Sequence, residues 1–417
     1  MSDKNKVQCS FCEKKIDKSA IKEGKEYVFL GASQDVVICR ECVNECVKII
    51  KDEASHAPKD INLDGLTPKT IKAQLDEWII GQDDAKVTLA IALYNHYKRL
   101  TQPEDDDEPI KKSNVLMVGS TGSGKTATVE ALAKIMDLPL VIEDVTSISS
   151  TGYVGRDTED ILKNLLTAAD NDLEKAQKGI VLLDEGDKLK REKNSSGARD
   201  VKGEGVQQGL LKMTEGGVFN VKTKSGTIHF DTTNVLFILS GAFEGIEKLI
   251  DKRLKSKNKQ ASVGFTGKID TKKDIQKYNE LIVQVKHEDL KEFGMMPELL
   301  GRFPVVTALQ ELSEEALVEI LTKPKNAIVK QYTKLFAADG MELTFSEEAL
   351  FAIAREAKER KIGARALRSI VEEVLKKPMF EAPGEEITAV IVNNDLNINY
   401  IRQPKTEEVE GVESEEI

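Results

Sequence analysis

Apolar residues recur along this chain in two spacings, and the change between them divides it into regions. Between about residues 66 and 310, short apolar runs alternate with segments of helical pattern. The runs are Val115–Val118, Leu140–Glu143, Ile180–Leu183 and Val235–Leu239. Strands that alternate with helices in this way are typical of an α/β domain built on a parallel sheet. We therefore expect that fold class for the middle of the chain.

From about Glu311 the pattern becomes mainly helical. Ser313-Glu-Glu-Ala-Leu and Ser346-Glu-Glu-Ala-Leu have the serine cap and the early acidic residues of helix starts. A further amphipathic helix is expected over 364–375, and a short strand region over 386–401. The pattern predicts a second, smaller and mainly helical domain.

A glycine-rich loop follows the first apolar run. Gly119 to Thr126 satisfies G-x-x-x-x-G-K-[ST], between a strand at 115–118 and a helix expected at 127–136. Backbone N–H groups of such a loop surround phosphate oxygens, the lysine reaches the β- and γ-phosphates, and the hydroxyl binds Mg²⁺. A chance glycine loop is disfavoured because four fixed positions and both flanks agree. The predicted contacts to ATP and Mg²⁺ are Ser120, Thr121, Gly122, Ser123, Gly124, Lys125, Thr126 and Ala127.

A second motif is the apolar strand Gly179–Leu183, which ends in two carboxylates. Asp184 suits the Mg²⁺ shell beside a phosphate loop. Glu185 is placed to orient and activate an attacking water. A solvated Asp-Glu pair at a strand end is the alternative, and the complete phosphate loop upstream disfavours it.

All five cysteines lie within the first 46 residues. Cys9 and Cys12 form one C-x-x-C pair and Cys39 and Cys42 another, with 26 residues between the pairs (39 − 12 − 1). Four thiolates make the closed tetrahedral set of a structural Zn²⁺ site. Reduced structural cysteines are the alternative, and Cys46 is left over. Because local charges are mixed, we expect this module to bind protein or to dimerise rather than to bind nucleic acid.

Composition sets the remaining boundaries and excludes some partners. The predicted parts are a zinc-binding domain over 1–51, a linker over 52–64, a large domain over 65–310, a small domain over 311–402 and an acidic tail over 403–417. The net charge of −11 argues against nucleic acid as the main partner. The first residues lack the apolar core of a signal peptide, and no apolar run approaches the roughly 18 residues of a membrane span. The expected location is the cytoplasm.

Several further segments, in order, carry a resemblance to the ClpX-type AAA+ protein unfoldases. They are Ile79-Ile-Gly-Gln82 followed by Tyr94-Asn-His-Tyr-Lys-Arg99, Gly152-Tyr-Val-Gly155, Gly203-Glu-Gly-Val-Gln-Gln208, Pro297-Glu-Leu-Leu-Gly-Arg-Phe-Pro304 and Gly363-Ala-Arg-Ala-Leu-Arg368. The resemblance covers Cys9 to about Tyr400. It implies an AAA+ large domain with a small lid domain, assembled as a homohexamer. It also implies ATP-driven unfolding of tagged or unfolded proteins, adaptors bound through the zinc domain, and a ClpP-type peptidase partner.

The resemblance also implies roles for single residues. Ile79 and Ile80 would contact adenine. Tyr153 and Val154 would form the pore loop, which grips substrate. Arg302 would be an arginine finger that reaches a neighbouring subunit's nucleotide, and Arg365 a second sensor. Val263, Gly264 and Phe265 would dock the peptidase, and residues 191–200 would line the channel.

The chain departs from the family pattern at four places. Ser120 replaces a usual proline, Gly186 a usual branched residue, and Arg156 a usual acidic residue. No contiguous Arg-Lys-His occurs between Val221 and Phe230, where the family has its entrance loop. We expect the enzyme to tolerate Ser120 and Gly186, with Gly186 loosening the strand end, and the other two to change substrate preference.

Two rival functions stay open at this point. One is a nucleic-acid-remodelling AAA+ ATPase whose zinc module grips DNA or RNA, and net acidity and the Gly-Tyr-Val-Gly loop speak against it. The other is a nucleotide-gated binding scaffold that scarcely hydrolyses ATP. The chain shows no protease motif, so peptide cleavage is expected to belong to the partner.

Overall fold

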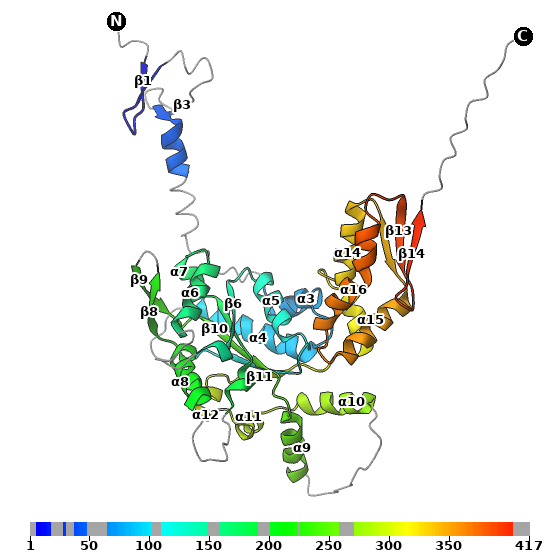
Figure 1. Ribbon diagram of the computed structural model, residues 1–417. Coiled ribbons are helices and arrows are strands. Elements are labelled where there is room, and N and C mark those ends of the chain that lie inside the picture. Colours follow the sequence, from blue (N-terminus) through cyan, green and yellow to red (C-terminus); the bar gives the residue numbers. More distant parts are fainter. Residues whose placement is uncertain are drawn as a thin grey trace, which may run out of the picture. The chain divides into compact units, whose positions relative to one another are not determined.

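The computed structural model describes residues 6–17, 28–30, 37–47, 65–101, 110–148, 158–190, 201–223, 226–257 and 271–402. By their contacts the residues fall into two units, Met1–Asn62 and Leu63–Ile417. Each unit is described separately below (Figure 1).

Two small hairpins and a helical segment over residues 40–47 form the described part of the first unit. Strand β1 (Lys6–Gln8) pairs antiparallel with β2 (Lys15–Asp17), and β3 (Val28–Leu30) pairs with β4 (Val37–Cys39). The buried residues that pack together here are Cys9, Ile16 and Cys39. Two of these three are cysteines, so this cluster supplies little hydrophobic stabilisation and depends on what the thiols bind.

A five-stranded parallel sheet is the centre of the second unit. Its strands are β5 (Val115–Val118), β6 (Leu140–Asp144), β7 (Ile180–Asp184), β10 (Leu236–Gly241) and β11 (Val305–Ala308). Their order across the sheet is β11-β5-β10-β7-β6. Every residue of β5 and β10 is buried, as expected for strands covered on both faces. The parallel sheet predicted from the apolar runs is confirmed.

Helices and one hairpin surround this sheet (Figure 1). The helices are α3 (Pro68–Asp76), α4 (Asp83–Leu100), α5 (Lys125–Ile135), α6 (Thr158–Ala168), α7 (Leu173–Gln177), α8 (Val201–Glu215), α9 (Ile246–Lys257), α10 (Thr271–Ile282), α11 (His287–Phe293) and α12 (Pro297–Leu300). Two 3₁₀ turns, η2 (Val145–Ser147) and η3 (Gly186–Leu189), follow β6 and β7. The hairpin pairs β8 (Val218–Thr223) with β9 (Gly226–Asp231).

Residues 314–402 have a hydrophobic core of their own. The helices are α13 (Glu314–Thr322), α14 (Ile328–Ala338), α15 (Glu347–Glu359) and α16 (Arg365–Glu381). Strands β12 (Glu342–Phe345), β13 (Ile387–Val392) and β14 (Ile398–Arg402) form a three-stranded sheet. Ser313 and Ser346 cap α13 and α15 through their side chains, as predicted. The sequence analysis missed β12, and it ended the last helix six residues too early.

Strand β11 was also missed. Its four residues include two that are only partly buried, so the apolar run is too short to stand out in the sequence. The strand forms because Val305–Ala308 pairs in parallel with Val115–Val118 of β5, nearly 190 residues earlier. This pairing places the chain that leaves the sheet beside the phosphate loop.

Among the described residues, no helix is both long enough and apolar enough to cross a membrane.

The side chain of Asn114 joins three backbone segments by hydrogen bonds, and its removal tests how much these bonds stabilise the fold. Its side chain is buried, donates to the carbonyls of Thr214 (2.9 Å) and Arg302 (2.8 Å), and accepts from the N–H of Phe237 (3.2 Å). Asn114→Ala leaves these backbone groups without a partner, so we expect the free energy of unfolding to fall by about 2–4 kcal/mol. Urea unfolding followed by the fluorescence of Trp78 measures it.

The matched control is Asn95→Ala, at an exposed position of α4 where alanine favours the helix. It should change the free energy by less than about 0.5 kcal/mol. A loss no larger for Asn114→Ala than for this control would contradict the bridging role.

Candidate functional site

The phosphate loop connects β5 to α5. Gly119–Gly124 forms the turn, and Lys125 is the first residue of the helix. Gly122 and Gly124 have φ angles of 79° and 100°, which glycine adopts without steric cost. The free N–H groups at the start of α5 therefore face the loop, where they favour an anion. The structure brings the predicted contacts from Ser120 to Ala127 together in one strand–loop–helix unit.

Lys125 is turned back onto its own loop. Its Nζ donates to the carbonyl oxygens of Gly119 at 2.7 Å and Ser120 at 3.0 Å. Burial lowers the pKa of Lys125, while the charge of Asp184 opposes that shift. The ammonium group is thus held at the loop by weak neutral acceptors, and a phosphate would be a stronger partner.

Asp184 and Thr126 meet, as the two motifs predicted. The Thr126 hydroxyl donates to Asp184 Oδ2 at 3.3 Å. The other carboxylate oxygen accepts from the Ser240 hydroxyl at 2.5 Å and from the N–H of Glu185 at 3.0 Å. A hydroxyl and an oriented carboxylate side by side are the oxygen ligands that Mg²⁺ takes next to phosphates. The sequence analysis missed Ser240, although a hydroxyl at the end of an apolar strand was a usable signal.

Glu185 follows β7 with a backbone conformation that is uncommon for a non-glycine residue. Its φ and ψ are 58° and 30°, in the left-handed region. The side chain is exposed, and the structure shows no partner for it among the described residues. A carboxylate held outside the sheet edge without a partner is available to a water molecule.

Gly186 does not leave a gap at the strand end, contrary to expectation. It is buried, and a Cβ atom there would lie 2.7 Å from Cδ1 of Leu239. Leu239 of β10 thus fills the space that a branched side chain at position 186 would need. The smaller residue is compensated by a larger neighbour, so the strand end stays packed.

A cavity of about 410 Å³ lies beside the phosphate loop. Ile79 and Ile80 line it, as predicted for an adenine site, and Ser123, Gly124 and Ala127 supply its phosphate-loop side. The large domain also contributes Trp78, Glu130, Ala131 and Lys134. The C-terminal part of the chain supplies the rest of the lining: Leu312, Ile320, Pro324, Asn326, Ile328, Gln331, Ala364 and Arg368. The mixture of apolar walls and a few polar groups suits a nucleotide base.

The segment Tyr94–Arg99 does not belong to this cavity. Tyr97 is buried and donates its hydroxyl hydrogen to the Lys178 carbonyl at 2.6 Å, and His96 Nε2 lies 3.1 Å from the Asn234 carbonyl. Burial lowers the pKa of His96 to about 3, so the ring is neutral. The contacts of Tyr97 and His96 instead anchor the far end of α4.

The start of α16 packs directly on the phosphate loop. The N–H of Ala364 donates to the Gly122 carbonyl at 3.3 Å. A Cβ atom on Gly122 would lie 2.2 Å from the Ile362 carbonyl oxygen, and one on Gly363 would lie 2.9 Å from the Gly122 carbonyl oxygen. Arg365 is exposed at the first position of the helix, and its charge contributes to lowering the pKa of Lys125. The predicted second sensor therefore lies within electrostatic reach of the phosphate loop.

Arg302 lies on the surface of the large domain, in the turn after α12. Its guanidinium is 41% exposed and forms an ion pair with Glu215 at 2.7 Å. The side chain does not line the cavity beside its own phosphate loop. An exposed ion pair of this kind is weak, so the guanidinium is free to exchange partners.

Other predicted sites lie partly or wholly outside the described residues. Tyr153 and Val154, Arg156, residues 191–200, and Val263, Gly264 and Phe265 fall outside them. The expected entrance loop between Val221 and Phe230 belongs to the β8–β9 hairpin. His229 of this hairpin has its Nδ1 2.8 Å from Asn220 Oδ1 across the strands.

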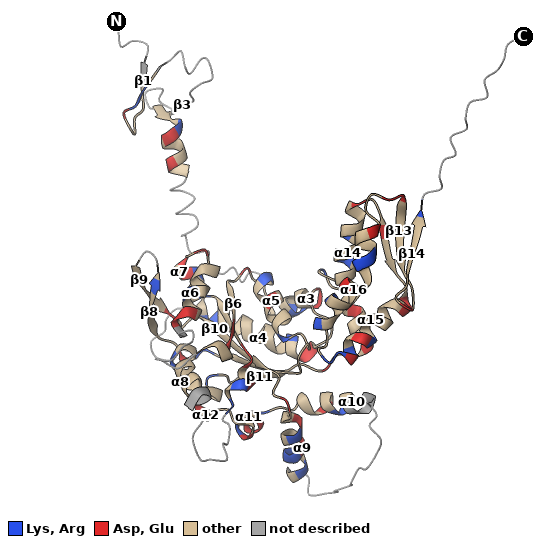
Figure 2. Ribbon diagram, in the orientation of Figure 1, with Lys and Arg blue, Asp and Glu red and all other residues tan. Residues whose placement is uncertain are grey.

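Acidic and basic side chains are interspersed on most elements, and α9 shows the clearest basic run (Figure 2). That helix is not a free cationic surface. Arg253 pairs with Asp289 at 2.7 Å, Lys252 with Glu292 at 2.7 Å, and Lys255 with its neighbour in the helix, Asp251. Three of the cations on α9 thus have acidic partners, so the helix is less cationic than its basic run alone indicates.

The four predicted zinc ligands converge in the first unit. The Sγ atoms of Cys9, Cys12, Cys39 and Cys42 all lie within 4.8 Å of one another. A tetrahedral Zn²⁺ with Zn–S bonds of about 2.3 Å requires sulfur–sulfur distances of about 3.8 Å, so the set fits that ion. The N–H groups of Cys12 and Cys39 lower the pKa of Cys9 to about 6, whereas the side chain of Cys12 and burial raise the pKa of Cys42. Four thiols this close ionise together only when a cation such as Zn²⁺ lies between them. Cys46 does not belong to this cluster.

Two family models match the second unit. Residues 110–306 match the AAA domain of the Cdc48 subfamily. Residues 312–389 match the C-terminal, D2-small domain of ClpB protein. The sheet, the phosphate loop and the C-terminal helices therefore form the two-part ATPase module of the AAA+ class.

Curated relatives match almost the whole chain. The ATP-dependent Clp protease ATP-binding subunit ClpX of Bacteroides fragilis is 45% identical over 401 residues, which cover 92% of this chain and 93% of the relative. The protein of the same name from Treponema denticola is 42% identical over 95% of each chain. That from Bacteroides thetaiotaomicron is 44% identical over 92% of each chain. The chain belongs to the ClpX family of AAA+ ATPases.

Proposed function

We propose that this protein is an ATP-driven unfoldase that threads substrate proteins through a ring pore and delivers them to a ClpP-type peptidase. The observation that carries the proposal is a nucleotide site built from both domains, with α16 packed on the phosphate loop. Any change at the phosphates then moves one domain against the other, which is what mechanical work requires. Family membership does not favour the nucleic-acid-remodelling alternative.

The residues around the phosphate loop divide the work of hydrolysis. Bound ATP supplies the phosphoryl group, and Mg²⁺ neutralises the charge that develops on its oxygens. Lys125 leaves the Gly119 and Ser120 carbonyls to hold phosphate, while Thr126 and Asp184 hold the metal. Ser240 and the N–H of Glu185 keep the Asp184 carboxylate oriented. Glu185 accepts a proton from the attacking water.

Arg302 and Arg365 complete the site from outside the phosphate loop. Arg365, at the start of α16, senses the nucleotide for the small domain. Arg302 exchanges its Glu215 partner for the γ-phosphate held by a neighbouring subunit. Arginine fingers contribute roughly 10³ to 10⁵ in rate in other NTPases. This arrangement requires a ring, and the family's hexamer is the assembly that we propose.

The remaining roles complete the proposed machine. Tyr153 and Val154 grip an extended polypeptide in the pore. The apolar tripeptide Val263-Gly264-Phe265 docks the ring onto the peptidase. The zinc module binds adaptors or substrates, or dimerises, and the proposed location is the cytoplasm.

Glu185→Gln tests the proposed base. Glutamine cannot accept the proton from water, so we expect the ATPase rate constant to fall at least 100-fold. The affinity for a fluorescent ADP analogue should stay within threefold, because Glu185 does not line the nucleotide cavity.

The control for this variant is Glu359→Gln, an exposed position of α15. It should leave both quantities unchanged. Undiminished ATP turnover in Glu185→Gln would instead support a nucleotide-gated scaffold.

The variants Tyr153→Ala and Phe265→Ala distinguish unfolding of the substrate from its delivery to the peptidase. With ATP and a ClpP-type peptidase, the parent chain should degrade a stable tagged fluorescent protein. Tyr153→Ala should slow the loss of fluorescence at least tenfold with or without the peptidase. Phe265→Ala should block degradation while ATPase activity is kept. Unfolding by Tyr153→Ala at the parent rate would refute the pore loop, and degradation by Phe265→Ala at the parent rate would refute the docking role.

Zinc content tests the N-terminal module. Elemental analysis should find about one zinc per chain, and Cys39→Ser should lose it together with the fold of residues 1–62, whose small core depends on these cysteines. Cys46→Ser is the control and should keep the metal, because Cys46 stands outside the cluster. Full zinc content in Cys39→Ser would contradict the ligand set.

A further inference from the structure

The linker that joins the sheet domain to the small domain is held by two amide side chains. Gln82 accepts a hydrogen bond from the N–H of Gln310 at 2.8 Å and donates to the carbonyl of the same residue at 2.8 Å. Asn279 forms the same two kinds of hydrogen bond with the next linker residue, Glu311. It accepts from the Glu311 N–H at 2.7 Å and donates to the Glu311 carbonyl oxygen at 3.1 Å. Each side-chain amide therefore forms two hydrogen bonds with the backbone of one linker residue, an arrangement that we call a clamp.

The linker is fixed along three consecutive residues. Just before the two clamped positions, the N–H of Leu309 donates to the Val118 carbonyl at the end of β5 at 2.7 Å. After them, Leu312 lines the nucleotide cavity and Ser313 caps α13. Residues 309–311 are thus all hydrogen-bonded to the large domain, and Leu312 is the first linker residue after these bonds.

Gln82 also reaches the phosphate loop. Its Nε2 donates to the Ser123 carbonyl at 3.1 Å, in addition to the bond to Gln310. The side chain is only 8% exposed, and its residue starts α4 with a left-handed φ of 59°. The Gln82 clamp is therefore connected to the phosphate loop as well as to the linker.

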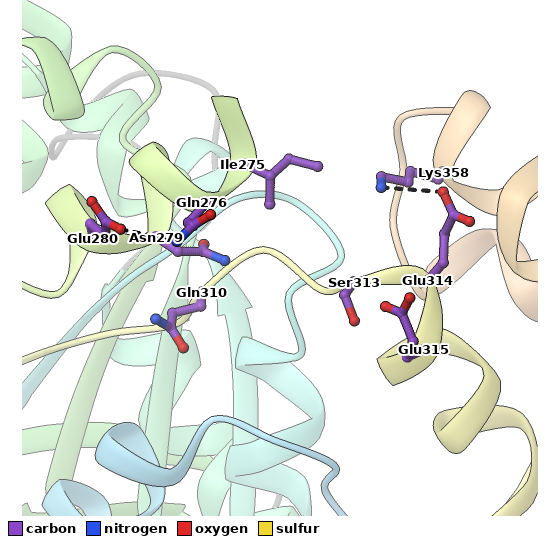
Figure 3. A pocket seen from close by; sticks show the side chains of 9 residues that line it. All are labelled: Ile275, Gln276, Asn279, Glu280, Gln310, Ser313, Glu314, Glu315 and Lys358. Atoms are coloured by element: carbon purple, nitrogen blue, oxygen red, sulfur yellow. Dashed lines mark hydrogen bonds and ion pairs between the residues drawn. The ribbon is translucent and has the colours of Figure 1, made fainter. Parts of the chain in front are cut away.

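A cavity of about 460 Å³ borders the Asn279 clamp (Figure 3). It lies between α10, the linker and the ion pair of Glu314 with Lys358 at 3.4 Å. Open space beside a fixed linker lets the small domain turn without displacing packed side chains from this face.

We propose that Gln82 and Asn279 are positioning residues that fix the linker at 310 and 311, so that the small domain turns about Leu312 and Ser313. Neither side chain lines the nucleotide cavity, so neither binds ATP directly. They act instead on the position of the small-domain residues that line the nucleotide cavity. When the clamp is lost, the small domain adopts more orientations, and the fraction of molecules with a complete cavity falls. The apparent nucleotide affinity falls by that same fraction.

Asn279→Ala tests this in the full chain. The ADP dissociation constant, measured with a fluorescent ADP analogue well below the melting temperature, should rise about 3- to 10-fold. Hydrogen–deuterium exchange at the Glu311 amide should speed up at least tenfold, since its acceptor is gone. Asn279→Ser, which cannot donate as the amide does, should show the same two effects if the alanine variant folds poorly.

The matched control is Gln276→Ala, one turn earlier on α10. Gln276 lines the same cavity, but its side chain donates only to Glu280, at 3.4 Å, and makes no bond to the linker. It should leave ADP affinity and linker exchange unchanged. Gln82→Ala should weaken ADP binding as well, and the double variant Gln82→Ala/Asn279→Ala should lose less affinity than the product of the two single losses, because both act on one linker.

The outcomes are separable. Faster Glu311 exchange with unchanged ADP affinity would overturn the inference, because the clamp would then be a local structural contact only. If Gln276→Ala lost as much ADP affinity as Asn279→Ala, that result would also overturn the inference. The wider consequence, fewer unfolding events per ATP hydrolysed in Asn279→Ala, rests on the proposed function. A parent chain that unfolds no substrate would refute the proposed function. The ADP affinity and the exchange rate of the Glu311 amide would still test the role of Gln82 and Asn279.

Discussion

The close packing of two backbone segments, Gly122 in the phosphate loop and Ile362–Ala364 before α16, is the contact on which the site depends. A single methyl group on Gly122 would collide with the Ile362 carbonyl, so no side chain separates the domains there. At Gly122 the phosphate loop is therefore in direct contact with the backbone of the small domain. A ligand that enters this loop has to be accommodated by both domains, and that is why binding and domain orientation are linked.

The strand order of the sheet brings the chemistry to one edge. In the order β11-β5-β10-β7-β6, the strand that ends in Asp184 is separated from the phosphate-loop strand by β10 alone. Ser240 at the end of β10 fills that interval and hydrogen-bonds to Asp184. Because parallel strands share the direction of their carboxyl ends, groups from three segments far apart in the chain face one ligand.

Local chemistry was predictable wherever the sequence carries its own geometry. The phosphate loop, the cysteine pairs and the serine caps of α13 and α15 act over a few residues, and each is found where the sequence predicted it. Prediction was weaker where a residue's role depends on a distant neighbour. Ser240, Gln82 and Leu239 have ordinary sequence surroundings, and the hydrogen bond of Tyr97 with the Lys178 carbonyl joins residues 81 positions apart.

The sequence by itself determined the class of domain and the candidate nucleotide and zinc ligands, because these follow from short spacings, and its ordered motifs carried the resemblance to the family. Only the tertiary structure decided how the two domains share one site. It paired β11 with β5, set residues 310 and 311 between Gln82 and Asn279, and closed α16 over Gly122. The physical reason is that buried N–H and C=O groups must find partners, and which partners they meet is settled by chain packing over hundreds of residues.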